Sequence, residues 1–149
     1  MSLQTNVMTA MKDAMKAKDQ NALTSLRAIK SEILKAQTET GSKKEISEEE
    51  ELKLLQKLVK QRKDSAAIYK EQNREDLAVD ELAQVEVIER FLPEQLSEEK
   101  VGEVIEQIIA ETGADGMKDM GKVMGIASQK LAGKADGKTI SIIVKSKLS

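Results

Sequence analysis

Apolar residues recur every three or four positions along most of the chain, which predicts a succession of amphipathic helices. In the first part, the spacing predicts helices over about residues 3–18, 20–37, 48–73 and 74–91. The residues expected to face inward are Val7, Met8, Met11, Ala14, Met15, Ala22, Leu23, Leu26, Ile29, Ile33, Gln37, Leu52, Leu55, Leu58, Val59, Arg62, Ala66, Tyr69, Leu77, Ala78, Leu82, Val85, Ile88, Phe91 and Leu92. Four helices joined by short connections predict a bundle or a pair of helical hairpins.

Polar residues mark where these helices begin. Asp19 is expected to cap the second helix, and Ser47 with Glu50 forms a capping box before the third and longest helix. Between those two helices, residues 38–44 lose the periodicity and predict a surface loop.

The single proline predicts a domain boundary, because Pro93 cannot continue the fourth helix. Beyond it, Ser97 is expected to cap a fifth helix whose inward residues run from Val101 to Ile109. A sixth helix is predicted over residues 117–131, and a seventh over 138–148 behind Asp136. The predicted fold is all-α, with an N-terminal helical-hairpin bundle of four helices over residues 1–92 and a small C-terminal three-helix domain over residues 96–149.

Composition excludes much catalytic chemistry. The 149 residues include no cysteine and no histidine, which removes thiolate nucleophiles, histidine bases and the usual zinc ligands. We therefore expect no metal and no cofactor. The N-terminal residues do not resemble a signal peptide, and no apolar run approaches the ~20 residues of a membrane span. A cytoplasmic protein without a membrane partner is the simplest expectation.

Glycine and lysine gather near the C-terminal end. Residues 113–149 hold seven lysines against three aspartates, a net charge of +4, and six of the eight glycines of the chain. One hypothesis is that lysine ammonium groups and free helix-start amides bind phosphates there, beside a backbone that the glycines shape. The residues concerned are Lys118, Lys122, Lys134 and Lys138, with Gly121, Gly125, Gly133 and Gly137.

The alternative is structural. The glycines at positions 121 and 125 would let two helices pack closely, while the lysines only solvate the surface. Under either interpretation, Gly125→Val is expected to crowd this helix and harm folding or close approach. The long third helix poses the same choice, because its lysines either bind an acidic partner or form a solvated face balanced by nearby acids. With no aromatic residue near the C-terminal lysines, recognition of nucleic acid would rest on shape and backbone contact rather than on base stacking.

Three motifs carry a resemblance to a known family. They are residues 91–99 (FLPEQLSEE), residues 119–125 (DMGKVMG) and residues 133–137 (GKADG). Together with residues 60–65 (KQRKDS) and Tyr69, they resemble the YqeY-like family over essentially the whole chain. The resemblance implies an N-terminal helical domain followed by a three-helix module. It also implies a relationship to the tail domain of the B subunit of the tRNA-dependent amidotransferase, a tail that approaches the tRNA.

The family label mentions carbon–nitrogen ligase activity with glutamine as amido-N-donor. The sequence, however, holds neither an amidase nucleophile site nor an ATP-dependent activation site that we can identify. The preferred hypothesis is therefore a tRNA-binding or amidotransferase-associated accessory protein. Its expected partners are tRNA and components of the amidotransferase or of aminoacyl-tRNA synthetases. The alternatives are a helical protein–protein interaction module without nucleic-acid binding and, more weakly, a stand-alone enzyme. Oligomeric state and physiological substrate stay open.

Overall fold

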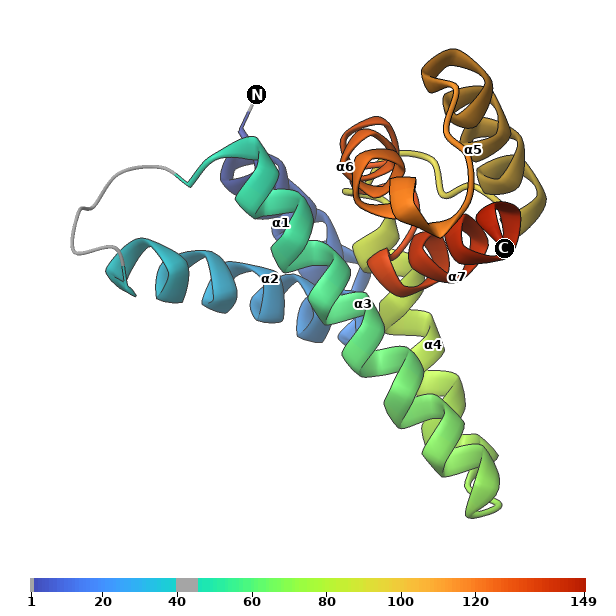
Figure 1. Ribbon diagram of the computed structural model, residues 1–149. Coiled ribbons are helices and arrows are strands. Elements are labelled where there is room, and N and C mark those ends of the chain that lie inside the picture. Colours follow the sequence, from blue (N-terminus) through green and yellow to red (C-terminus); the bar gives the residue numbers. More distant parts are fainter. Residues whose placement is uncertain (1, 40–45) are drawn as a thin grey trace. The chain divides into compact units, whose positions relative to one another are not determined.

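The computed structural model describes residues 2–39 and 46–149, and every regular element in this part of the chain is helical (Figure 1). The all-α prediction is thus confirmed. The elements are α1 (Leu3–Ala17), α2 (Gln20–Glu39), α3 (Glu48–Glu71), α4 (Glu75–Glu89), α5 (Glu98–Thr112), the 3-10 helix η1 (Met117–Asp119), α6 (Met120–Lys130) and α7 (Gly137–Leu148). None of the described helices has the length and the apolar run that crossing a membrane requires.

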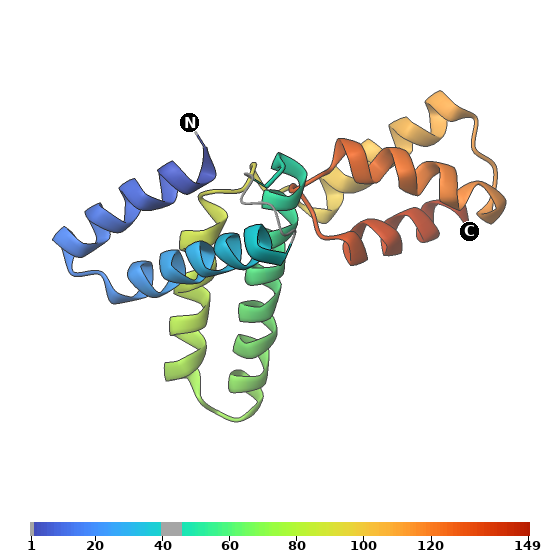
Figure 2. The same ribbon diagram turned by 90° about the vertical axis from the view of Figure 1, so that its left-hand side faces the viewer.

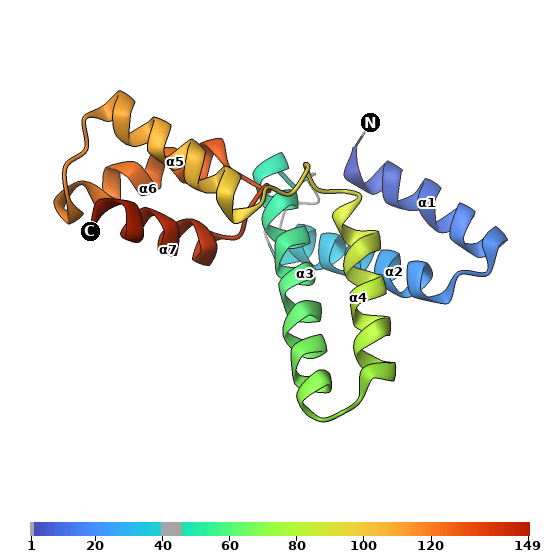
Figure 3. The same ribbon diagram turned by 90° about the vertical axis from the view of Figure 1, so that its right-hand side faces the viewer.

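The chain divides into two compact units, residues 1–92 and residues 93–149. In the first unit, α3 and α4 run side by side as a hairpin, and α2 lies across them (Figures 2 and 3). Helix α1 packs on α2. Leu26, Ile29, Leu55 and Ile88 are fully buried where the helices meet, so the core is mainly aliphatic, as expected of a chain with only two aromatic residues.

Side-chain caps begin α2, α3 and α5 at the predicted residues. The Ser47 hydroxyl accepts a hydrogen bond from the backbone amide of Glu50 at 3.1 Å. The Asp19 carboxylate accepts one from the amide of Ala22 at 3.1 Å, and the Ser97 hydroxyl accepts one from Lys100 at 3.2 Å. Each cap satisfies a backbone amide that has no partner inside its helix.

Several predicted inward residues are wrong. Met8 and Met15 are 47% and 52% exposed, and Leu82 is 38% exposed. Leu54 and Val87, which the pattern did not single out, are buried instead. The reason is that periodicity identifies an apolar side of a helix, whereas the position of the neighbouring helices decides which flank of that side is covered.

Two boundaries also differ from the prediction. Thr38 and Glu39, assigned to a loop by the sequence, form the end of α2, where the Thr38 hydroxyl donates to the carbonyl of Lys35 at 2.9 Å. Residues 40–44 of the predicted loop lie outside the described residues. Helix α3 ends at Glu71, and Asn73 has a left-handed φ of 60° that turns the chain into α4.

In the second unit, α5, α6 and α7 pack around their own core (Figure 3). Val101, Ile105, Ile108, Val123 and Val144 are fully buried in it. Gly113 closes α5 with a φ of 68°, a left-handed conformation that glycine adopts without steric cost. The predicted sixth helix starts as expected at residue 117, but its first turn is the tighter η1.

Candidate nucleic-acid interface

The lysines singled out by the sequence lie in two pairs at opposite ends of α6. Lys118 is in η1 and Lys122 is in the first turn of α6. Lys134 is in the turn that follows α6, and Lys138 is in the first turn of α7. All four are exposed. Because α6 has 11 residues, the two pairs are separated by roughly 16 Å along the helix axis.

Ion pairing distinguishes these four lysines from two others of the same unit. Within residues 2–39 and 46–149, no carboxylate forms an ion pair with any of the four. Two other lysines of the same unit are paired, Lys130 with Glu111 at 3.5 Å and Lys147 with Glu106 at 2.5 Å. The structure therefore separates the basic residues of this unit into a paired set and an unpaired set.

Three of the four glycines face open space. Gly121, Gly125 and Gly137 are exposed, and a Cβ atom built on each would meet no atom within 4 Å. The interpretation that Gly121 and Gly125 allow close packing of two helices is therefore wrong within this unit. A Cβ at Gly125 meets no neighbour, whereas the effect of the larger side chain in Gly125→Val stays a prediction. Glycine in a helix still costs roughly 0.5–1 kcal/mol relative to alanine, and no contact of this unit offsets that cost.

Gly133 differs from the other three. It is buried and has a φ of 74°, so its backbone conformation itself favours glycine. Its carbonyl accepts a hydrogen bond from the side-chain amide of Gln95 at 2.6 Å, and the amide of Leu96 donates to the carbonyl of Lys134 at 2.9 Å. Two of the motifs that carry the family resemblance are thus joined directly, and Lys134 is held by its backbone while its side chain stays exposed.

Gln95 is the residue that the sequence reasoning missed. Its side-chain amide also donates to the carbonyl of Pro93 at 2.9 Å, so one amide group ties together the start of the unit and the turn before α7. Its place between the proline and the cap of α5 was visible in the sequence, but the carbonyl that it binds lies 38 positions away. Only the folded chain brings the two together.

The helix starts offer fewer free amides than the sequence suggested. At α7, the Asp136 carboxylate already accepts a hydrogen bond from the Thr139 amide at 2.6 Å. At α6, η1 precedes the helix, and the Met120 amide donates to the carbonyl of Met117. The exposed lysine side chains, rather than open helix ends, are consequently the groups best placed to meet an anion.

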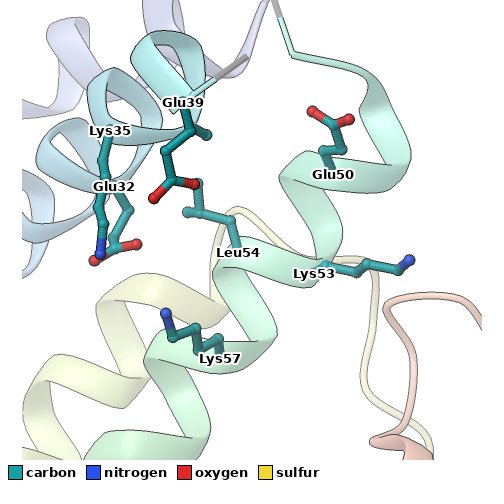
Figure 4. Close-up of a pocket in the computed structure, with 8 residues that line it drawn as sticks. Glu32, Lys35, Glu39, Glu50, Lys53, Leu54 and Lys57 are labelled. Atoms are coloured by element: carbon teal, nitrogen blue, oxygen red, sulfur yellow. The ribbon is translucent and has the colours of Figure 1, made fainter.

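A second candidate is an open groove of about 420 Å³ between α2 and α3, shown in Figure 4. Its lining mixes three glutamates and three lysines with Ala36 and Leu54. Glu39 and Lys57 point into the space between the helices, whereas Lys53 points away from α2. In the described part of the chain, no group of three or more acidic residues is arranged to hold a metal ion.

Comparison with known proteins places the chain among relatives. The model of the family described as Yqey-like protein matches residues 4–148. The "Altered inheritance of mitochondria protein 41, mitochondrial" of Pyrenophora tritici-repentis is 30% identical over 128 residues, which cover 84% of this chain and 68% of that protein. A glutamyl-tRNA(Gln) amidotransferase subunit of Thermococcus gammatolerans is 43% identical over 58 residues, which cover 39% of this chain and 9% of that protein. The segment shared with the amidotransferase is thus a small part of a much longer protein.

Proposed function

The chain belongs to the Yqey-like family, and from that premise we propose that it binds tRNA as an accessory protein of tRNA-dependent amidotransferases. Its similarity to a glutamyl-tRNA(Gln) amidotransferase subunit supports the association with such enzymes. The proposal assigns no catalytic step to this chain. The amidotransferase or an aminoacyl-tRNA synthetase would supply the chemistry, and this chain would contribute contacts to the tRNA.

The observation that carries the proposal is the unpaired set of lysines around α6. Ammonium groups without an acidic partner are free to replace the counterions of phosphates, which is the main source of affinity for a nucleic-acid backbone. Gly121 lies within the first pair of lysines along the chain and Gly125 lies between the two pairs, and the bare backbone at these positions would allow a ribose–phosphate chain to approach the helix closely. Two lysine pairs ~16 Å apart suit an extended strand or a groove better than a single phosphate.

The test measures binding of deacylated tRNA by fluorescence anisotropy over a series of salt concentrations. If Lys122 and Lys134 each contact a phosphate, the variant Lys122→Ala/Lys134→Ala should bind more weakly and lose up to about two contacts. The slope of log K against log salt should then become less steep by about 0.7–0.9 for each lost contact.

The matched control removes the same charge from the same unit. The variant Lys130→Ala/Lys147→Ala deletes the two paired lysines, whose charge Glu111 and Glu106 already balance. Circular dichroism must show that both variants stay folded. Equal loss of affinity in the two variants would mean that only net charge matters, and unchanged binding by the first variant would refute the proposed contacts. The protein-interaction module would then be the better hypothesis.

A further inference from the structure

The first unit presents a surface that the proposed function does not use. On α1, Ala10, Asp13 and Ala17 line a hollow on the side of α4. Two positions along a helix correspond to a rotation of about 200°, so Met15, two residues after Asp13, points to the opposite side. Met8 lies seven residues earlier on the same side, and both methionines are about half exposed, at 47% and 52%. Lys12, also exposed, lies between them on this side.

Helix α2 continues this surface. Glu32 and Ala36 face the groove toward α3, and Leu34, two positions from each, points the other way and is 45% exposed. Arg27 and Lys30 precede Leu34 by seven and four residues and therefore share its side. Since α1 and α2 pack together, the two sides form one face of the α1–α2 hairpin. We call it the outer face, and it consists of Met8, Lys12, Met15, Arg27, Lys30 and Leu34.

The outer face carries positive charge without acidic residues. The four acids of residues 2–39 all lie elsewhere: Asp13 and Asp19 line the hollow beside α4, and Glu32 and Glu39 line the groove beside α3. Across the described residues, none of the three basic side chains of the outer face forms an ion pair. The face therefore combines exposed apolar side chains with uncompensated basic ones.

We propose that the outer face docks an acidic amphipathic helix of a partner protein. The partner's apolar side chains would cover Met8, Met15 and Leu34, and its carboxylates would pair with the basic residues between them. Methionine suits such a surface because its flexible, polarisable side chain adapts to partners of different shape. A membrane fits less well, because the main apolar side of α1, with Leu3 and Val7, is buried in the core and cannot insert into lipid.

The test uses two synthetic helical peptides of roughly 20 residues, long enough to form a helix in water. Both carry leucines on one side, but one has glutamates on the other side and its twin has lysines. The 149-residue chain should bind the glutamate peptide at least about tenfold more tightly than the lysine peptide, and added salt should reduce the difference. Vesicles of phosphatidylglycerol serve as the third probe.

Matched variants locate the contact. The variant Met8→Gln/Met15→Gln/Leu34→Gln should weaken binding of the glutamate peptide about tenfold or more. The control Ile68→Gln/Val79→Gln, which changes exposed apolar residues of the α3–α4 hairpin, should not. Because the substituted side chains are exposed, both variants should keep the parent's circular dichroism.

The charges are tested in the same way. Replacing Lys12, Arg27 and Lys30 by glutamate should invert the preference between the two peptides. Replacing the exposed Lys57, Lys60 and Lys70 by glutamate changes the net charge equally and should leave the order of preference as it is. The proposal is overturned if the protein prefers neither peptide, if the control variants lose binding to the same extent, or if only the vesicles bind.

Discussion

Replacing Gly121 and Gly125 by alanine tests whether the bare surface of α6 serves folding. Both glycines lie within the helix, and a Cβ atom at either position meets nothing within 4 Å. Alanine removes the conformational freedom that glycine has in the unfolded chain, so each substitution should stabilise the helix by about 0.5–1 kcal/mol. Since the two new methyl groups meet no other residue, the effects should add to about 1–2 kcal/mol.

Native-state hydrogen exchange measures this change inside α6 without unfolding the other unit. A gain of about 1–2 kcal/mol should slow exchange of the α6 amides, such as those of Val123 and Ala127, by roughly 5- to 30-fold. Gly133→Ala is the control of opposite sign. Its φ of 74° forces alanine into the left-handed region, which costs about 1–2 kcal/mol and should speed exchange.

Exchange that stays unchanged or becomes faster in the Gly121→Ala/Gly125→Ala variant would refute this reasoning. Such a result would mean that the two positions meet another part of the protein in solution. Gly102→Ala serves as a comparison at a glycine that has a neighbour, because a Cβ at position 102 would lie 3.7 Å from the Lys147 side chain, an ordinary van der Waals distance. That substitution should change exchange by less than the pair at positions 121 and 125 does.

Three further predictions concern single contacts. Ser47→Ala should destabilise the start of α3 by about 1 kcal/mol, measured by exchange of the Glu50 amide, with the exposed Ser31→Ala within α2 as control. Gln95→Ala removes two side-chain hydrogen bonds, each worth about 0.5–1.5 kcal/mol, and should speed exchange in the turn at Lys134. Gln95→Glu keeps a side chain of similar size, but its carboxylate cannot donate to the Gly133 carbonyl, so this variant should lose that hydrogen bond as well. The hydrogen bond from Arg74 lowers the pKa of the Asp76 carboxyl below its ordinary 3.8. The α3–α4 turn should therefore keep this contact above pH 3.8 and lose it as acid protonates Asp76, which NMR titration of the Leu77 amide can follow.

The sequence predicted local features of the fold well. The caps at Asp19, Ser47, Ser97 and Asp136 are confirmed, because a cap depends on a hydroxyl or carboxylate and an amide three residues later. The exposure of Met8 was not predictable in the same way. It depends on which flank of α1 the other helices of the unit cover, and the packing of whole helices determines that.

The candidate site shows the same limit. Its lysines are exposed, as charged residues on helices usually are, but their state of pairing could not be derived from spacing. Lys147 and its partner Glu106 are 41 positions apart, and nothing in the sequence around Lys147 distinguishes it from Lys138. The open space beside Gly125 could not be predicted from the local sequence either, because a glycine at helical spacing is compatible with close packing as well as with a bare surface.

The proposal of tRNA binding and the alternative of a protein–protein interaction module would use the lysines and glycines of the C-terminal unit in different ways, and this makes them separable. A tRNA backbone needs the unpaired charges, so Lys122→Ala/Lys134→Ala should weaken its binding even if the glycines are replaced. A partner helix packed on α6 needs the close approach that Gly121 and Gly125 allow, so alanine there should block it while the lysine variant binds normally. If both variants weaken tRNA binding and both fold normally, the phosphate chain must run against the backbone between the lysine pairs. That outcome would explain why the exposed side of α6 carries two glycines that contact no other residue.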